Sequence, residues 1–403
     1  MKISLEQFAN LECDILNRVR AHPGISRVAI ARHLGIAPST VGSYVGRLIE
    51  AGFLAEAKQV NCETGRPPTA LRLNPGGGQF IGVDFEARNI MAVAVDFAAR
   101  SLRQTHKDIQ ASDSVPGILA KIEQAIVEVL PGKQERLLAI GVGVPGLVDP
   151  VKGVAVDYKY IKGWRQVALA APLAKRFGVP VYLENTIRSM ALAELWFGLG
   201  RGARDWLCVG IRSGIGSGIV AGGQLQRGAH YQSGEIGRWT CSWPTLAATR
   251  YFSRNGEAKT RNPELQEVAS AHALLDAWDR ARKSTQRGKR AQSPTPTLEG
   301  MARASQQGDA LTLGIIGVAA EVLGRAVGQL ALTLNPARVI MAGPLTLLGD
   351  ALLVPLRRHT QEALQASGAV VPEIVNSNMG EYNGALGAAA LAVHEWKPAF
   401  SRA

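Results

Sequence analysis

The chain has few of the features that characterise secreted, zinc-binding or membrane proteins. It contains four cysteines, Cys13, Cys62, Cys208 and Cys241, with no CxxC pair and no paired Cys/His spacing. This scarcity argues against a disulfide framework or a zinc site and predicts buried thiols. No uninterrupted apolar run reaches about 18 residues, so we expect no membrane partner. The first residues, MKISLEQFANLECD, are too acidic and polar for a signal peptide, which predicts a cytoplasmic protein.

The chain does contain enough apolar sequence for a large core. Its 403 residues are sufficient for about two or three domains, and 46% of them are hydrophobic. The formal net charge is +12 and the isoelectric point is near 9.8, which suggests an anionic partner such as nucleic acid. A basic, proline-containing run at 280–296 has the composition of an exposed loop.

Three stretches of the sequence differ in pattern. Residues 1–57 contain short helical patterns, residues 58–78 are turn-rich and end in a glycine linker, and strand and helix patterns alternate from Phe80 onward. Such alternation is typical of an α/β domain. The sequence therefore predicts a small helical domain joined to a larger α/β domain.

The N-terminal stretch predicts three helices. The first ends at the breaker residues 22–24, Ser26 caps the second, which ends at Gly35, and Pro38 suits the first position of the third. The apolar positions of the first and third helices are Leu11, Ile15, Leu16, Val19, Val41, Val45 and Leu48. Two helices separated by a short glycine-containing turn are typical of a helix-turn-helix domain.

The outer face of the third helix is polar. Its side chains can donate hydrogen bonds to phosphates and base edges, and they are Ser39, Thr40, Ser43, Tyr44 and Arg47. We therefore predict that this helix contacts double-stranded DNA. The alternative is that these are ordinary surface residues of a three-helix domain that contacts another protein.

A β-hairpin wing is predicted behind the helices. The segment NCETGRPPTALRL has alternating Thr69, Leu71 and Leu73, which suit the returning strand of the hairpin. Arg66 lies between a glycine and a proline, where it is placed to enter the narrow minor groove of an A·T-rich stretch.

With this N-terminus, the chain resembles the transcriptional regulators of the ROK family (repressors, open reading frames and kinases). The matching segments are IGVDF (81–85), GVGVPGLVD (141–149), ENTIRSMALAE (184–194), SGIGSGIVAGGQLQRGAHYQSGEIG (213–237), LNPARVIMAG (334–343) and GALGAAALA (384–392). Any one segment is weak evidence, but the series in this order behind a winged helix is specific.

The resemblance implies an α/β fold with two parts. A winged helix-turn-helix domain with its wing and linker would span residues 1–78, and a two-lobed actin-like ATPase (ROK) domain would span residues 79–403. Lobe 1 is expected at about 79–190 with a C-terminal helix at about 385–403, and lobe 2 at about 191–384. The resemblance also implies a ligand site between the lobes, a homodimer or homotetramer, and a palindromic operator.

The features that family kinases use for phosphoryl transfer are changed in this sequence. Glu86-Ala87-Arg88 replaces the Gly-Gly-Thr of the first phosphate loop, and its negative charge is expected to repel phosphate. The second loop reads RSGIG at 212–216, where the remaining glycines can serve a tight turn. The family's Asn-Asp is Asn185-Thr186 here, and a threonine hydroxyl cannot accept a proton near neutral pH. We predict no catalytic residue, no enzyme activity and no cofactor.

The structural zinc site of the family is changed as well. After Glu-Ile-Gly the family has a histidine and then a cluster of the type CxCGxxGCxE, whereas this chain has Arg238 followed by WTCSWPTLAATRYF. One cysteine and no histidine cannot supply tetrahedral N/S coordination locally, so we expect no metal.

The ligand residues that the resemblance implies are partly retained. Asn185 can donate to and accept from hydroxyls, Glu235 can accept from a pair of them, and Gly143 and Pro145 would shape the wall. Three positions differ from the family, where Tyr160, Thr186 and Arg238 replace asparagine, aspartate and histidine.

These replacements make the predicted pocket more electropositive. Thr186 removes a carboxylate and Arg238 adds a permanent cation. We hypothesise a sugar acid or sugar phosphate as the ligand, with Arg238 as its charge partner. The alternative is that Arg238 pairs with Glu235 and fills the space of the lost zinc.

The sequence is therefore interpreted as a DNA-binding transcriptional regulator, a repressor of carbohydrate uptake or catabolism controlled by a sugar-derived effector. It would act on a palindromic operator with A·T-rich flanks, in the cytoplasm and in association with the nucleoid. Two alternatives remain open: a sugar kinase with a fused DNA-binding domain, and a DNA-binding regulator without a ligand. The effector, the operator and the sign of regulation do not follow from the sequence.

Overall fold

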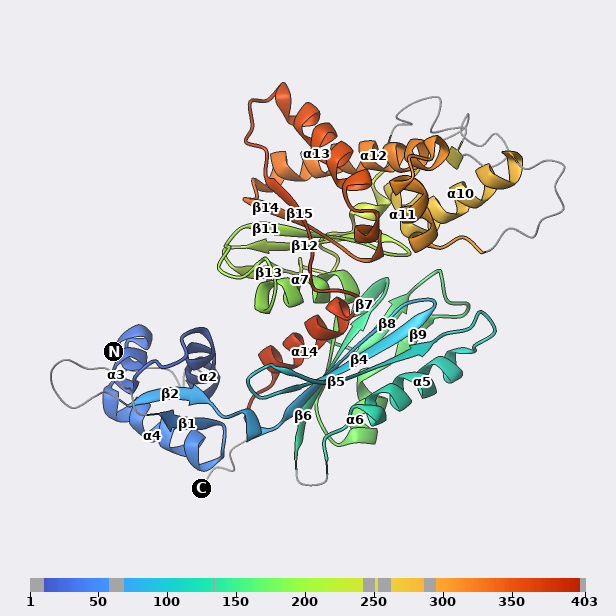
Figure 1. Ribbon diagram of the computed structural model, residues 1–403. Coiled ribbons are helices and arrows are strands. Elements are labelled where there is room, and N and C mark those ends of the chain that lie inside the picture. The colour runs from blue at the N-terminus through green and yellow to red at the C-terminus, as the bar shows by residue number, and fades with distance from the viewer. Residues whose placement is uncertain are drawn as a thin grey trace.

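The computed structural model describes residues 11–57, 69–132, 135–241, 251–252, 262–285 and 295–398. Arg66 and Cys62 lie outside these residues, so the predicted minor-groove contact of Arg66 stays a prediction. A small N-terminal domain is followed by two lobes, and each lobe is built on a five-stranded sheet (Figure 1).

The N-terminal domain has the three helices that the sequence predicts. Its elements are α2 (Leu11–Ala21), α3 (Arg27–Leu34), α4 (Pro38–Glu50), β1 (Leu54–Ala57) and β2 (Ala70–Leu73), and the two strands pair antiparallel. The hydroxyl of Ser26 accepts a hydrogen bond from the backbone N–H of Ala29 at 3.2 Å, and Gly35 ends α3 in the left-handed conformation. The predicted apolar faces of α2 and α4 are buried together.

Lobe 1 is a mixed sheet covered on both faces. Its strand order is β10-β6-β3-β4-β5, with β3 (Gln79–Phe85), β4 (Asn89–Asp96), β5 (Ser101–Asp108), β6 (Leu137–Val144) and β10 (Val181–Asn185). Helices α5 (Val115–Glu128) and α6 (Ala170–Phe177) contribute to the core on one face. The short 3₁₀ helix η1 (Pro75–Gly77) precedes β3, and a three-stranded sheet of β7 (Leu147–Asp149), β8 (Val154–Asp157) and β9 (Arg165–Ala168) follows β6.

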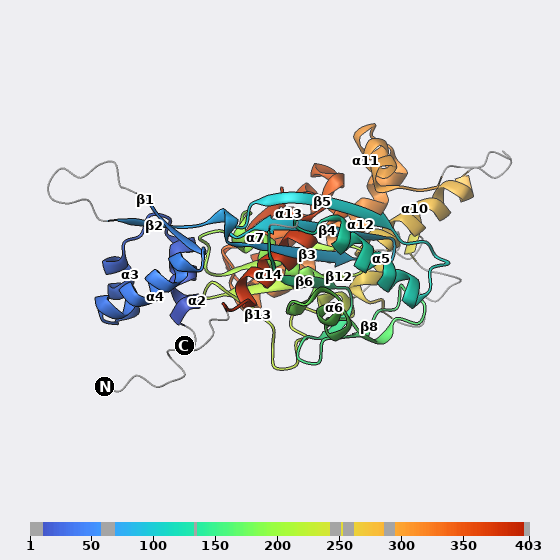
Figure 2. The ribbon, with the colours of Figure 1, turned by 90° about the horizontal axis from the view of Figure 1, so that it is seen from below.

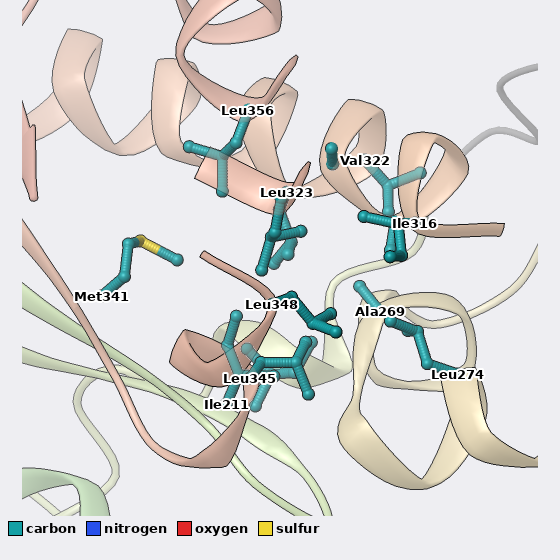
Figure 3. Close-up of a cluster of buried hydrophobic side chains, with 14 of the residues drawn as sticks. Ile211, Ala269, Leu274, Ile316, Val322, Leu323, Met341, Leu345, Leu348 and Leu356 are labelled. Carbon is teal, nitrogen blue, oxygen red and sulfur yellow. The ribbon is translucent and has the colours of Figure 1, made fainter. Parts of the chain in front are cut away.

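Lobe 2 has a sheet of order β13-β12-β11-β14-β15. These strands are β11 (Trp206–Ile211), β12 (Ile215–Ala221), β13 (Gln224–Gln226), β14 (Arg338–Ala342) and β15 (Glu373–Asn376). The helices are η2 (Ile236–Arg238), α9 (Leu265–Ala269), α10 (Ala271–Thr285), α11 (Leu298–Gln306), α12 (Ala310–Leu334), η4 (Pro344–Leu348) and α13 (Asp350–Gln365). Their apolar side chains form the largest core, in which Leu323 of α12 lies near Leu356 of α13 (Figure 3).

Helix α12 is long and apolar enough to cross a membrane by length and composition alone. Most of its apolar window is buried inside the protein, and the helix packs against α9, α10, α11 and α13. It is therefore explained as the central core helix of lobe 2.

Two helices lie between the sheets of the two lobes. These are α7 (Thr186–Trp196) and α14 (Asn383–Glu395), which pack against each other, and α14 also lies on the sheet of lobe 1 (Figures 1 and 2). The contact is close because glycines line the sheet: a Cβ atom at Gly82 would lie 2.0 Å from the backbone oxygen of Ala385. Helix α7 also packs on β11 and β12 of lobe 2, so the lobe boundary expected near residue 190 falls inside a helix that both lobes share.

Candidate effector cavity and DNA-contacting helix

A cavity of about 180 Å³ lies between the two lobes, at the N-terminus of α7. Judged by the volume that one bound water needs, the cavity has room for roughly a dozen non-hydrogen atoms, which is the size of a monosaccharide. Its lining includes Glu86, Pro145, Asp157, Lys159, Tyr160, Asn185, Thr186, Arg212, Ser217, Glu235, Arg238 and Glu264. Six of the seven predicted effector residues are in this lining, namely Pro145, Tyr160, Asn185, Thr186, Glu235 and Arg238.

Gly143 is the predicted wall residue that the cavity lining does not include. A Cβ atom at this position would lie 2.9 Å from Oδ1 of Asp84 and 3.4 Å from Oγ of Ser189. Gly143 therefore makes room for the Asp84 carboxylate behind the cavity, and the expectation that it shapes the wall directly is corrected.

Asn185 is largely occupied by its own helix. Its Oδ1 accepts hydrogen bonds from the backbone N–H groups of Ile187 at 2.8 Å and Arg188 at 3.3 Å, which caps α7. Its Nδ2 donates to the backbone oxygen of Gly146 at 2.9 Å. An amide nitrogen has two hydrogens, so one donor remains for a ligand, whereas the sequence suggested both donation and acceptance.

Thr186 is bonded to Asp84, near the end of β3. Its hydroxyl donates to Oδ1 of Asp84 at 3.0 Å, and both side chains are buried. Arg212, at the end of β11 in lobe 2, crosses to lobe 1 and pairs with Asp84 Oδ2 and Glu86 Oε1, each at 2.5 Å. We call Asp84, Glu86 and Arg212 the interlobe charge cluster.

In the interlobe charge cluster, Glu86 has a cationic partner that the sequence did not indicate. That the negative charge of Glu86 repels phosphate stays a prediction, and the guanidinium of Arg212 pairs with this carboxylate. Burial raises the pKa of Asp84 and of the partly buried Glu86, and the charge of Arg212 offsets only part of each rise. For Arg212, burial acts to lower the pKa, but the two carboxylates outweigh it and raise the pKa above its ordinary value.

Glu235 and Arg238 face the cavity without pairing with each other. Among the described residues no side-chain hydrogen bond or ion pair joins either one to a partner, so the pairing offered as an alternative in the sequence analysis is absent. Burial raises the pKa of Glu235, and the charges of Arg188 and Arg238 offset part of that rise. Because neither side chain has a partner among the described residues, both are available to a ligand.

Tyr160 belongs to an aromatic group that joins the lobes at the cavity. Its ring centroid lies 5.5 Å from that of Tyr158 in lobe 1 and 5.8 Å from that of His272 in lobe 2, both in edge-to-face geometry. Lys159 lies over the same ring at 5.2 Å. The ring offers an apolar surface of the kind that packs against the C–H face of a sugar.

The third helix of the N-terminal domain presents the predicted polar face. Ser39, Ser43 and Arg47 are exposed, and Thr40 and Tyr44 are partly exposed. Arg47 is held in place, because it donates to Glu12 Oε1 at 2.9 Å and lies 4.2 Å from the centre of the Tyr44 ring. Glu12 is 35 residues away in the chain and carries no sequence signal of this contact.

Residues near the cavity that the sequence analysis missed include Arg212, Ser217 and the pair Glu184 and Arg188. Glu184 and Arg188 are fully buried, with Arg188 Nε 2.7 Å from Glu184 Oε1. Glu184 lies in β10 and Arg188 in the first turn of α7, so helical spacing does not predict the pair. Among the described residues, no group of three or more His, Cys, Asp or Glu side chains is placed to hold a metal ion. The segment that follows Cys241 lies outside the description.

Comparison with known proteins identifies the two parts. The ROK family profile matches residues 80–395, and a profile described as winged helix-turn-helix DNA-binding matches residues 10–55. The chain therefore belongs to the ROK family, and it carries an N-terminal winged helix-turn-helix DNA-binding domain.

The relatives include both regulators and kinases. The xylose repressor of Caldicellulosiruptor bescii is 25% identical over 353 residues, which cover 85% of each chain. The N-acetylglucosamine repressor of Escherichia coli O6:H1 is 26% identical over 375 residues, which cover 91% of this chain and 88% of the relative.

Two solved structures share the fold. A ROK family transcriptional regulator, a homologue of the E. coli MLC protein, superposes with a TM-score of 0.74 at 22% identity and covers 95% of this chain and 97% of its own. A ROK family glucokinase from Streptomyces griseus, in complex with glucose and AMPPNP, superposes with a TM-score of 0.66 at 25% identity and covers 78% of this chain and 99% of its own. The actin-like, two-lobed architecture is thus that of both classes.

Proposed function

We propose that this protein is a DNA-binding transcriptional repressor of carbohydrate metabolism, and that a sugar-derived effector in the interlobe cavity controls its DNA affinity. The winged helix-turn-helix domain and the repressors among the relatives support DNA binding and repression. The relatives' names specify xylose and N-acetylglucosamine, which supports a carbohydrate effector. The observation that carries the proposal is a monosaccharide-sized cavity in whose lining Arg212 is paired with Asp84 and Glu86.

The cavity does not support phosphoryl transfer. A kinase needs a base for the acceptor hydroxyl and a set of backbone donors for phosphate. Thr186 cannot act as that base, and its hydroxyl already donates to Asp84. Arg212 is committed to two carboxylates, so its charge is not available to a transferred phosphoryl group. We infer that the protein is a regulator and has no kinase activity.

The chemistry of the lining favours a polyhydroxylated ligand. Glu235 offers a carboxylate with no protein partner among the described residues, and a carboxylate accepts from two neighbouring hydroxyls. Asn185 offers one remaining N–H, and the ring of Tyr160 offers an apolar face. Together these groups can orient a sugar ring between the two lobes.

An acidic group on the ligand is expected at Arg238 and away from Arg212. The interlobe charge cluster has two carboxylates and one guanidinium, so its end of the cavity carries a net negative charge. Arg238 is exposed at the lining and has no ion-pair partner in the described residues. We therefore propose Arg238 as the charge partner of a sugar acid or sugar phosphate.

We further propose that the protein acts as a homodimer or homotetramer on a palindromic operator with A·T-rich flanks, and that it is associated with the nucleoid. A twofold assembly places two winged helices on successive major grooves, which is how helix-turn-helix dimers read palindromes. The Ser39, Ser43 and Arg47 side chains of α4 would contact base edges and phosphates, and Arg66 would enter the minor groove.

The proposal is tested in two steps. First, calorimetry with a panel of neutral sugars, sugar acids and sugar phosphates, xylose and N-acetylglucosamine included, should find a ligand whose affinity falls at least about tenfold in Glu235→Ala, because a pair of charge-assisted hydrogen bonds is lost. The exposed Lys152→Met is the matched control, because Lys152 lies outside the cavity. If Arg238→Met leaves the affinity for every acidic sugar unchanged, the acidic effector is wrong.

The second step addresses DNA and catalysis. The wild-type chain should select a palindromic duplex from a random pool, and its affinity for that duplex should fall steeply with salt. ADP release from ATP should stay at background with every sugar of the panel. Sustained sugar-dependent ADP release would favour the fused kinase instead, and duplex binding that no sugar alters would favour the regulator without a ligand.

A further inference from the structure

One segment of lobe 2 carries several residues of the cavity lining. We call residues 227–238 the cavity segment, because Ser233, Gly234, Glu235 and Arg238 line the cavity. The backbone of Gly234 is held closely to β12, since its oxygen accepts a hydrogen bond from the N–H of Ser217 at 2.7 Å. A ligand that bonds to Glu235 therefore acts directly on this segment.

Arg227, the first residue of the cavity segment, bridges two other parts of the molecule. Its Nε lies 2.6 Å from Oε2 of Glu184, at the end of β10 in lobe 1, and its Nη2 lies 3.3 Å from Oε1 of Glu395. Glu184 is fully buried and also pairs with Arg188, whose Nη1 donates to the backbone oxygen of Ser233 at 3.2 Å. The cavity segment is thus bonded to lobe 1 at two points.

The other partner of Arg227 lies at the end of α14, beside the DNA-binding domain. Glu395 is the last residue of that helix, and the ring of the next residue, Trp396, packs edge to face against three phenylalanines. The ring centroids are separated by 5.1 Å for Phe53, 5.7 Å for Phe80 and 5.8 Å for Phe97. Phe53 belongs to the N-terminal domain and precedes β1, whereas the other two belong to lobe 1.

The N-terminal domain is attached firmly to this aromatic group. Arg136 of lobe 1 lies 4.5 Å from the centre of the Phe53 ring and donates to the backbone oxygens of Ala51 and Gly77, each at 2.9 Å. The N-terminal domain, lobe 1 and α14 share one continuous apolar core. A displacement of Trp396 is therefore passed to the domain that holds α4, because a close-packed core has little free space.

The two ion pairs of Arg227 differ in how easily they can change. Glu184 is buried but keeps Arg188 as a second partner, and Glu395 is 38% exposed, so water can replace Arg227 there. Neither carboxylate would be left buried and unpaired if Arg227 moved, so the rearrangement avoids the large cost of an isolated buried charge. The ion pair of Arg227 with Glu395 can therefore be made or broken at low cost, and a switch needs two such arrangements.

We propose that Arg227 couples the cavity to the DNA-binding domain. A ligand at Glu235 shifts the cavity segment, the shift changes the pairing of Arg227 with Glu395, and Trp396 then changes its packing against Phe53. Arg227 is a positioning residue, because it is not part of the cavity lining and does not lie on the DNA-contacting helix. The proposal rests on the proposed function, since it explains how an occupied cavity alters DNA affinity.

The test uses a mutation in place of the unidentified effector. A Cβ atom at Gly234 would lie 1.7 Å from the backbone oxygen of Ser217, so Gly234→Ala forces the cavity segment to move. Its effect is measured on the Kd for the duplex that the wild-type chain selects from a random pool. We expect Gly234→Ala to change this Kd at least about fivefold in the wild-type background and less than about twofold in the Arg227→Met background.

A matched control separates coupling from a general loss of rigidity. Arg338 is a half-buried arginine of lobe 2 that pairs with Glu373 at 2.7 Å and donates to the backbone oxygen of Leu199, with no contact to the cavity segment. In the Arg338→Met background the full effect of Gly234→Ala should persist. An effect of Gly234→Ala that is equal with and without Arg227, or no effect in the wild-type background, overturns the coupling while the proposed function stands.

A second measurement requires neither duplex binding nor a folded Gly234→Ala variant. Arg227→Met should speed hydrogen exchange at least about threefold at the backbone amides of both residues 227–238 and residues 53–57, because both ends of the connection lose a restraint. Arg338→Met should change neither region. If exchange at residues 53–57 stays at the wild-type rate in Arg227→Met, the coupling through Arg227 is overturned. A wild-type chain that selects no duplex contradicts the proposed function instead, so the two failures are distinguishable.

Discussion

The hydroxyl of Thr186 donates a hydrogen bond to Oδ1 of Asp84 at 3.0 Å, and Arg212 binds the other oxygen of the same carboxylate. The residue at the start of α7 is thus a structural partner of Asp84, near the end of β3. The Thr186 hydroxyl and the Arg212 guanidinium together satisfy both oxygens of the buried Asp84 carboxylate.

Thr186→Asp is expected to destabilise the protein without restoring catalysis. The new carboxylate would lie beside Asp84 at a buried site, where two like charges cannot both ionise freely. Thr186→Val removes only the hydrogen bond to a charged acceptor, which is worth about 2 kcal/mol. Denaturant unfolding should give a larger loss for the aspartate than for the valine, and ADP release should stay at background for both. Sugar-dependent turnover by Thr186→Asp would contradict this account.

Arg212→Met is expected to lower the free energy of unfolding by about 4 kcal/mol, because it leaves the buried Asp84 and the partly buried Glu86 without a cation. The combined variant Asp84→Asn, Glu86→Gln and Arg212→Met removes the charges together and should recover most of the loss. Chemical denaturation of both variants checks this. A combined variant that is as unstable as Arg212→Met alone would show that packing, and not charge, holds this region.

The raised pKa of Glu235 gives a pH dependence of defined sign. The folded state binds this proton more tightly than the unfolded chain does, so ionising Glu235 costs stability. The wild-type chain should therefore lose stability relative to Glu235→Gln as the pH rises from about 4.5 through the raised pKa of the folded state. Urea unfolding of the two proteins across this range measures the difference, and parallel curves would exclude the effect.

The affinity for the ligand should also depend on the ionisation of Glu235. Here the ionised form is favoured, whereas the protonated form is favoured for stability. A carboxylate accepts from two hydroxyls, whereas its protonated form has lost part of that capacity. Affinity for a bound sugar should therefore fall as the pH is lowered through the pKa of Glu235, and Glu235→Gln should bind weakly with little pH dependence. Calorimetry at several pH values distinguishes the two.

The position of Arg47 against Glu12 predicts opposite effects of two substitutions on DNA binding. Arg47→Ala should weaken binding to all sequences and reduce the slope of log K against log salt by about 1, because one phosphate contact is lost. Glu12→Gln removes a negative charge that holds Arg47 at 2.9 Å, so binding should tighten. Fluorescence anisotropy with a labelled duplex, titrated with salt, measures both. Equal affinities for Glu12→Gln and the wild-type chain would argue that Arg47 does not contact phosphate.

The N-terminal domain could be predicted because its signals are local. Ser26 caps a helix that begins one residue later, Gly35 ends that helix, and Pro38 begins the next. Each signal acts within a few residues, so no tertiary information is needed to interpret it. The fold of the larger domain could also be predicted, because its six matching segments occur along the chain in the order that the family has.

The contacts of the site could not be predicted in the same way. Arg212 lies more than a hundred residues from Asp84 in the sequence, and nothing in the RSGIG loop indicates that its arginine crosses to the other lobe. Arg227 and Glu395 are joined only because α14 returns to lie between the lobes. The family resemblance implied Asn185 as a ligand residue, but the oxygen of its amide caps α7. Side chains that bind each other across lobes are set by tertiary packing, which a single sequence does not reveal.

The central claim is that one chain contains two coupled sites, a sugar site and a DNA site. The most direct test measures the Kd for the selected duplex with and without a saturating sugar from the panel, and the Kd for that sugar with and without the duplex. Linkage requires the two affinities to change by the same factor, which we expect to be at least about fivefold. If sugars bind in the cavity but none of them changes the affinity for the duplex, the account is contradicted.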